Sequence, residues 1–276
     1  MRVLGVDFTS APRPAKPIVV AHGELDDTLL TIERIERIAD FSGFERVLRR
    51  PGPWIGGFDF PFGLPRALVT ELGWPLAWPA LVTHFAALDR SRIANAFAAF
   101  RASRPAGAKY AHRAGDSASG AHSSMKLVNP PVAWMLHEGA PRLLAAGVHV
   151  PGLCNGDRER VALEAYPGLA MRSLAARLGW TRARSYKNDA RPLQTPARRD
   201  ARVALVDALL RGDHRCGIAM RVANGQREAA IDDASGDTLD AMAACAQAAW
   251  GAQRRDRNYG LPEGVDSIEG WIVTAQ

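Results

Sequence analysis

The chain has little of what disulfide, zinc and membrane proteins are built from. Its three cysteines are far apart and odd in number, at positions 154, 216 and 245. They form no C-x-x-C pair, which argues against a disulfide framework or a zinc knuckle. The seven histidines show no H-x-x-x-H or H-E-x-x-H spacing, so zinc is not supported either. There is no 18-residue apolar run and no apolar signal region, so we expect no membrane partner and a reduced cytoplasmic location.

Phosphate-binding and nucleophile signatures are missing as well. The sequence contains no Walker-type loop and no G-x-S-x-G elbow, and Gly56-Gly57 is too short to indicate a nucleotide loop. What is present is ordinary globular composition, with 47% hydrophobic and 23% charged residues in 276. The net charge of +6 suits a polyanionic partner such as nucleic acid. Because the excess is mostly arginine spread along the chain, a merely solvated surface explains it equally well.

Short apolar runs separated by turn residues predict a mixed α/β fold. We expect five strands, at 2–8, 16–25, 28–35, 54–60 and 161–166, with a short sixth one less clearly indicated at 269–273. Helical spacing is found at 41–50, 66–100, 132–146, 168–178, 197–211 and 237–250. The first three strands form a meander, and the first, fourth and fifth are parallel with helical crossovers. Residues 103–130 lack periodicity and are expected to be a long functional loop.

Acidic residues stand at or near the ends of three of these strands. They are Asp7, Asp59 and Glu164. In an open α/β sheet ligands bind beyond the carboxyl ends of the strands, so these side chains are candidates for a shared site. Several converging carboxylates repel one another unless a cation lies between them. Simpler alternatives stay open, because Asp7 also suits a turn and Glu164 also suits a pair with an arginine.

Two more acids, Asp237 and Asp240, open an alanine-rich helix. They suit helix capping and the helix dipole. However, positions 237, 240, 241, 244 and 248 share one face, and the alanines on it make the helix thin enough to pack closely on a sheet. That packing would aim both acids towards the strand ends, where oxygen ligands suit Mg²⁺ or Mn²⁺.

Five segments in order carry a resemblance to a known family. They are GVDFTS (5–10), GFDFPFGLP (57–65), EAYP (164–167), DTLDAMAA (237–244) and EGWI (269–272). Together they resemble the family catalogued as domain of unknown function 429, which is predicted to contain nucleases of the RNase H-like fold. The resemblance implies a single domain over 1–276, with a five-stranded RNase H-like sheet flanked by helices. It also implies that residues 64–155 are a mostly helical insertion.

The resemblance implies a site for two Mg²⁺ or Mn²⁺ ions that hydrolyses phosphodiester bonds. Asp7 would bridge the ions, Asp59 would bind one of them, and Asp240, helped by Asp237, would complete the metal ligands. Glu164 matches a family motif and joins Asp7, Asp59 and Asp240 as a candidate catalytic residue. Basic residues near the site are candidates for substrate phosphate contacts: Lys109, Arg113 and Lys187.

Two other functions remain open at this point. An actin- or sugar-kinase-like phosphotransferase also begins with Gly-x-Asp, but it needs a duplicated domain, and the chain has no internal repeat. A non-catalytic module that binds nucleic acid or protein would keep the fold without needing an ion. The sequence does not distinguish DNA, RNA and small phosphoesters as substrates, and it leaves the oligomeric state open.

Overall fold

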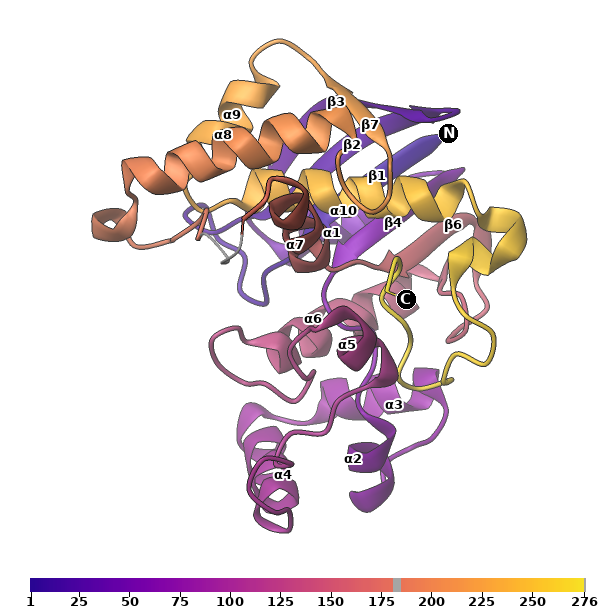
Figure 1. The fold of residues 1–276 in the computed structure, drawn as a ribbon. Helices are drawn as coiled ribbons and strands as arrows, with labels where there is room; N and C mark the ends of the chain where they lie inside the picture. Colours follow the sequence, from indigo (N-terminus) through magenta and orange to yellow (C-terminus); the bar gives the residue numbers. More distant parts are fainter. Residues whose placement is uncertain (181–184, 276) are drawn as a thin grey trace.

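The chain forms a mixed α/β fold around one seven-stranded sheet (Figure 1). The computed structural model describes residues 1–180 and 185–275. Its strands are β1 (Arg2–Asp7), β2 (Ile18–Asp26), β3 (Leu29–Ile38), β4 (Trp54–Asp59), β5 (Val148–His149), β6 (Asp157–Glu164) and β7 (Ala219–Val222). They lie in the order β5-β6-β4-β1-β2-β3-β7.

The centre of the sheet follows the predicted pairing. Strands β1, β2 and β3 form the antiparallel meander, while β4 is parallel to β1 and β6 is parallel to β4. The β1–β4 register places Asp7 directly beside Asp59. In the next pair Phe58 lies opposite Glu164. The carboxyl ends of these three strands therefore meet at one edge of the sheet.

The predicted count of five strands is wrong for the described residues, because the sheet has two further edge strands. Strand β5 has two residues beside β6, and β7 has four residues beside β3. Edge strands pair on one side only and can be very short, so they leave no long apolar run in the sequence. The short strand considered at 269–273 is a single bridge between Ile272 and Glu164.

Helices cover both faces of the sheet. They are α1 (Phe41–Leu48), α2 (Arg66–Glu71), α3 (Trp78–Ala87), α4 (Arg90–Ala102), α5 (Ala114–Ser119), α6 (Val132–Ala146), α7 (Pro167–Arg177), α8 (Pro196–Arg211), α9 (Gln226–Asp232) and α10 (Asp237–Ala252), with 3₁₀ turns at Arg191–Leu193 and Arg255–Gly260. Helices α7 to α10 pack with one face of the sheet, and α1 with α2, α3, α4 and α6 share a core with the other. No described helix is long and apolar enough to cross a membrane.

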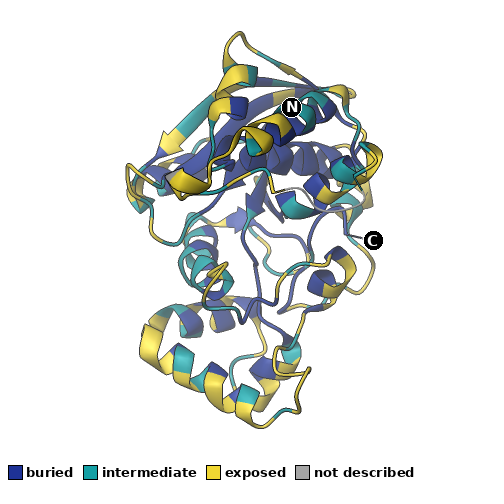
Figure 2. Ribbon diagram, turned by 60° about the vertical axis from the view of Figure 1, so that its left-hand side comes forward, coloured by how far each residue is buried: buried dark blue, intermediate teal, exposed yellow. Residues whose placement is uncertain are grey.

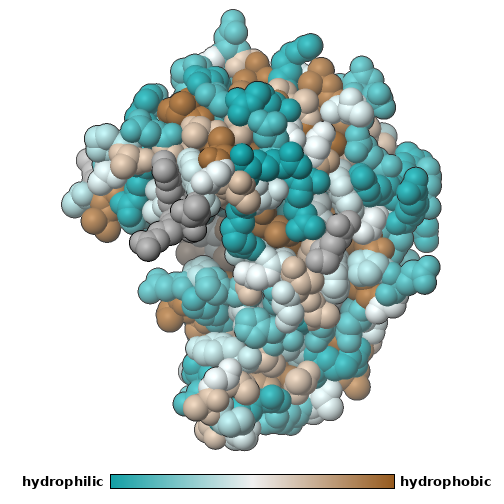
Figure 3. Space-filling view, viewed as in Figure 1, coloured by the Kyte–Doolittle hydropathy of each residue, from teal (hydrophilic) through white to brown (hydrophobic). Residues whose placement is uncertain are grey.

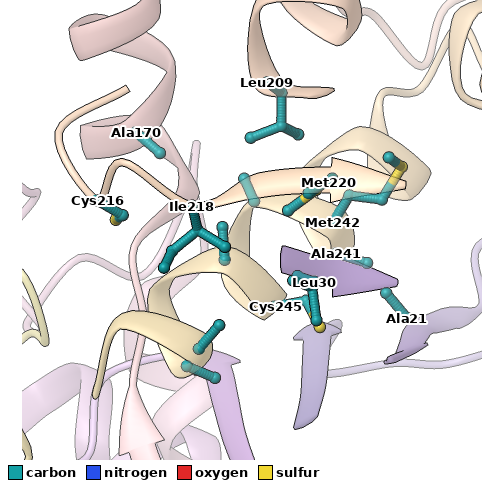
Figure 4. Close-up of a cluster of buried hydrophobic side chains, with 14 of the residues drawn as sticks. Ala21, Leu30, Ala170, Leu209, Cys216, Ile218, Met220, Ala241, Met242 and Cys245 are labelled. Atoms are coloured by element: carbon teal, nitrogen blue, oxygen red, sulfur yellow. The ribbon is translucent and has the colours of Figure 1, made fainter. Parts of the chain in front are cut away.

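Helix α10 is the central element of its layer, and all its residues are buried (Figure 2). Figure 4 shows Ala241, Met242 and Cys245 of this helix among side chains from β2, β3 and β7. Two glycines, Gly5 and Gly57, lie opposite each other in β1 and β4 beneath it. A Cβ atom built on Gly5 would lie 2.1 Å from the Ala241 carbonyl oxygen. One on Gly57 would lie 2.4 Å from the Ala244 carbonyl oxygen, so the helix backbone rests directly on the sheet.

Helices α2 to α6 lie within residues 64–155 and form the lower part of the molecule in Figure 1. Aromatic rings fill its interior, with Trp74, Phe85 and Phe97 in mutual contact. The segment 103–130, expected to be a loop, contains the short helix α5. Buried polar groups fix this segment, because Arg113 and Asp116 hold each other and the end of β6. A sequence without periodicity can therefore still be ordered by specific ion pairs.

Candidate functional site

The four aspartates of interest gather where β1 and β4 end beneath the first turn of α10. Side chains alternate along a strand, so Asp7 and Asp59 lie on the same sheet face as Gly5 and Gly57, the face that α10 covers. Asp237 and Asp240 occupy the first turn of that helix. The exposed fractions of Asp7, Asp237 and Asp240 are 8%, 3% and 1%.

The predicted capping role of Asp237 is taken by another residue. Helix α10 begins after Gly236, which has a positive φ of 79° and no side chain to cap with. The Asp233 carboxylate instead accepts a hydrogen bond of 2.9 Å from the backbone N–H of Thr238. It also accepts one from the Thr238 hydroxyl. Asp237 and Asp240 are thereby released from capping and face the strand ends.

The carboxylates of Asp7 and Asp59 have no hydrogen-bond partner among residues 1–180 and 185–275. Burial, followed by the negative charges of Asp237 and Asp240, raises the pKa of Asp7 well above its ordinary value. Burial and the charge of Asp240 raise the pKa of Asp59 to about 7. Asp7 is buried and Asp59 is partly buried. Two mutually repelling carboxylates without donors are groups that a hard cation could compensate.

Two lysines hold the helix acids. The Lys16 ammonium lies 2.9 Å from one Asp237 oxygen and 3.1 Å from the other, and 3.0 Å from Asp189. The Lys187 ammonium binds Asp240 Oδ2, while the Tyr186 hydroxyl donates to Asp240 Oδ1 at 2.7 Å. Burial opposes the charge of Lys187, but Asp240 with Tyr186 and Asp7 raises its pKa well above the ordinary value. Lys187, predicted to contact phosphate, is therefore placed among the acids themselves.

Glu164 is paired with an arginine, the alternative that the sequence left open. The Arg113 guanidinium donates to both Glu164 oxygens, at 2.6 and 2.8 Å. It also donates to Asp116 at 2.6 Å and to the Glu269 carbonyl at 2.9 Å. Glu164 accepts a further hydrogen bond from the backbone N–H of Phe62. Arg113 is only 2% exposed and its donors are occupied, so it acts here as a buried counter-ion of Glu164 and Asp116.

A cavity of about 260 Å³ adjoins the aspartates. One wall carries Asp59, Asp240, Tyr186 and Lys187. The remaining lining comes from the ends of β4 and β6, from α7, from residues 113–135 and from the chain end: Phe60, Pro61, Arg113, Asp116, Ala121, His122, Pro130, Val132, Met135, Glu164, Ala165, Tyr166, Pro167, Gly168 and Ile272. Figure 3 shows the molecular surface hollowed between the sheet-bearing part and the helices below it.

The segment 103–130 borders this cavity through Arg113, Asp116, Ala121 and His122. Lys109, predicted to contact phosphate, is exposed in the same segment but does not line the cavity. No sequence pattern singles out Lys16, Tyr186 or Asp116. Lys16 lies before β2 in a turn-rich stretch. Because it is 221 positions from Asp237, their contact cannot be predicted from the sequence.

The site contains carboxylate oxygens of the kind that bind hard cations, but they do not surround a common point. Among residues 1–180 and 185–275, no three His, Cys, Asp or Glu side chains are close enough together to hold a metal ion. The donors nevertheless fit Mg²⁺ or Mn²⁺, because Asp7 and Asp59 are neighbouring carboxylates that nothing else satisfies. Asp240 interacts with both of them, but its two oxygens are held by Tyr186 and Lys187.

Comparison with known proteins gives one finding. A family model described as protein of unknown function (DUF429) matches residues 5–266. Neither the curated proteins nor the solved structures contain a match to the chain. The site geometry is therefore the main guide to the chemistry.

Proposed function

The chain belongs to the DUF429 family of proteins of unknown function, and we propose that it is a divalent-metal-dependent nuclease that hydrolyses phosphodiester bonds. The observation that carries this proposal is Asp7. The residue is 8% exposed, and its carboxylate lacks a hydrogen-bond donor within the described residues, yet it interacts with three other acids. A buried charge in this situation costs several kcal/mol unless a partner compensates it, and a cation is the simplest partner.

The sheet supports an RNase H-like arrangement. Its five central strands lie in the order β3-β2-β1-β4-β6, and only β2 is antiparallel to its neighbours. The acids project from the carboxyl ends of β1 and β4 and from the helix packed across them. The short strands β5 and β7 extend this core at its edges without changing the site.

Each residue has a distinct task in the proposed reaction. Asp7 and Asp59 would hold Mg²⁺ or Mn²⁺, and Asp240 would stay beside them with its two oxygens held by Tyr186 and Lys187. A divalent ion held there would supply a Lewis acid that lowers the pKa of a water and stabilises negative charge on the leaving oxygen. Lys187, which lines the cavity, neutralises phosphate charge. Arg113 keeps Glu164 in place at the cavity wall, so Glu164 positions the substrate pocket through its buried ion pair.

The cavity supports a substrate with an unpaired nucleotide beside the scissile bond. Its volume of about 260 Å³ is near the lower end of the usual range for small-molecule sites. Its wall mixes apolar surfaces, such as Met135 and Tyr166, with the polar groups next to Asp59. A single nucleobase suits a cavity of this size better than a stacked duplex does. The net charge of +6 suits the flanking phosphates.

The two alternatives have less support. A phosphotransferase of the actin type needs a second phosphate-binding sheet, and the described residues form one sheet. A non-catalytic module does not require Asp7 and Asp59 to be buried without donors. Placing a buried and a partly buried carboxylate side by side without donors is a cost that a metal site explains and a passive surface does not.

Calorimetric titration with Mn²⁺ tests the proposal directly. The wild type is expected to bind the ion, and Asp7→Asn is expected to lose that binding while remaining folded. Single-stranded DNA and RNA are then incubated with both proteins in Mg²⁺ and in EDTA. Cleavage by the wild type in Mg²⁺ alone supports a nuclease. Metal binding without cleavage of either polymer would point to a small phosphoester, and absence of metal binding would refute the site.

A further inference from the structure

The four acids of the site are already half neutralised by the protein. Asp7, Asp59, Asp237 and Asp240 bring four negative charges, and Lys16 and Lys187 bring two positive ones. Lys16 also contacts Asp189, but the Asp189 side chain is 69% exposed and water screens its charge, so the balance concerns only the four acids of the site. The formal balance is therefore two negative charges. One divalent ion brings this balance to zero, whereas two ions would leave an excess of two positive charges in a largely buried site.

Hydrogen bonding separates the four acids into two that have donors and two that have none. Both Asp237 oxygens contact the Lys16 ammonium. Both Asp240 oxygens are also engaged, one by the Tyr186 hydroxyl and the other by Lys187. Only Asp7 and Asp59 lack a donor within the described part of the chain. Asp7 is more than nine-tenths buried and interacts electrostatically with the other three acids, so it is an unsatisfied group that points to a missing ligand.

The residues that hold Lys187 in the site are themselves fixed. The Tyr186 carbonyl accepts a hydrogen bond of 2.7 Å from Arg202, whose side chain is buried and also donates to the Ile231 carbonyl. The Asn188 N–H donates to the Ala234 carbonyl at 3.0 Å, and Ala234 lies two residues before Gly236, the N-cap of α10. The Lys187 side chain is 45% exposed and lines the cavity. It therefore reaches both the acids and the space open to substrate.

We infer that the site takes a single divalent ion, held by Asp7 and Asp59, and that the Lys187 ammonium supplies the second positive charge. The inference rests on the proposed metal site and replaces the two-ion arrangement that the family resemblance implies. In that arrangement a second ion, bound through Asp240, balances the charge of the leaving group and the phosphate. Here Lys187 already occupies Asp240, and its exposed flank is directed at the cavity where a phosphate would lie.

Counting bound ions without substrate tests this inference. Mn²⁺ is titrated calorimetrically into the wild type, Lys187→Met and Lys187→Arg, and each sample is examined by electron paramagnetic resonance. The wild type and Lys187→Arg are expected to bind one ion per chain, with the spectrum of an isolated Mn²⁺. Lys187→Met is expected to bind two, with the broadened spectrum of coupled ions, because Asp240 Oδ2 loses its partner and a single ion then leaves one negative charge uncompensated.

Lys109→Met is the matched control, because Lys109 is an exposed lysine that does not line the cavity. It should bind one ion like the wild type. Circular dichroism and thermal melting establish that each variant is folded, and Lys187→Gln replaces Lys187→Met if the latter is not. Two ions in the wild type, or one ion in a folded variant without the Lys187 charge, would overturn the inference and leave the proposed function intact. No ion in the wild type would refute the proposed function itself.

Discussion

The raised pKa of Asp59 makes the stability of the metal-free protein depend on pH in a defined way. Its folded-state pKa of about 7 lies about 3 units above the value of 3.8 for a solvated aspartate. The folded state therefore binds more protons than the unfolded state between about pH 4 and 7, and the free energy of unfolding falls as pH rises through this window. Above pH 7 the full cost of the buried charge is present.

Replacing Asp59 with asparagine removes this cost. Three units correspond to about 4 kcal/mol, and water reaching the carboxylate from the cavity reduces this to about 2–4 kcal/mol. Asp59 accepts no hydrogen bond within the described residues, so replacing its carboxylate with the asparagine amide breaks no hydrogen bond there. In EDTA at pH 8, Asp59→Asn should be more stable than the wild type by this amount. At pH 4 the two proteins should be equally stable, because the wild-type carboxyl is then protonated.

Urea unfolding of both proteins in EDTA, at several pH values from 4 to 8, measures the difference. Comparison with Asp59→Asn cancels other titrations, such as that of His22, whose pKa is lowered by burial to about 4 and which acts in the opposite direction. Asp26→Asn, at an exposed position at the end of β2, is the control and should follow the wild type. A difference between the wild type and Asp59→Asn that does not change with pH would show that Asp59 is not a destabilising buried charge.

Further predictions concern metal, packing, ion pairing and nucleic acid. Mg²⁺ or Mn²⁺ at 100 times its Kd should stabilise the wild type by about 2.7 kcal/mol and Asp59→Asn by much less, as melting curves would show; a wild-type melting temperature indifferent to millimolar ions contradicts the site. Gly5→Ala should cost about 3 kcal/mol or more in urea unfolding, since its methyl group would overlap the backbone of α10; an unchanged midpoint would disprove that contact. Arg113→Met should cost about 3–5 kcal/mol by leaving Glu164 unpaired in the interior, and adding Glu164→Gln should restore part of that stability. Binding of single-stranded DNA or RNA with Ca²⁺ in place of Mg²⁺ should weaken with salt, and replacing the exposed Lys109 with alanine should flatten the slope by at most about 0.7, whereas no binding at low salt would exclude a nucleic-acid substrate.

The central sheet could be predicted because its strands carry buried apolar runs. The order of β1, β2, β3, β4 and β6 follows from the meander and from the parallel crossovers. The helix α10 was equally clear from its alanines and from the acids at its start. The edge strands β5 and β7 escaped prediction, because two to four residues paired on one side produce no distinctive pattern.

The candidate site was only partly predictable. Strand ends indicate where carboxylates gather, but they do not reveal which cations reach them from distant segments. Lys16 is 221 positions from Asp237, and Arg113 is 51 positions from Glu164. Such pairs depend on the folded path of the chain. The close approach of α10 to Gly5 could not be predicted either. A glycine in a strand indicates that something packs close to the backbone, but it does not identify which element does so.

The walls of the cavity come from two sources that are separate along the chain. The acids lie on the sheet and α10, whereas Pro130, Val132 and Met135 belong to the segment between β4 and β5. Selection can therefore alter the shape of the pocket through the insertion while the carboxylates keep their spacing. Homologues that differ mainly between residues 64 and 155 should then share one chemistry and differ in the molecules they accept. Exchanging this segment between relatives is a direct route to new specificity.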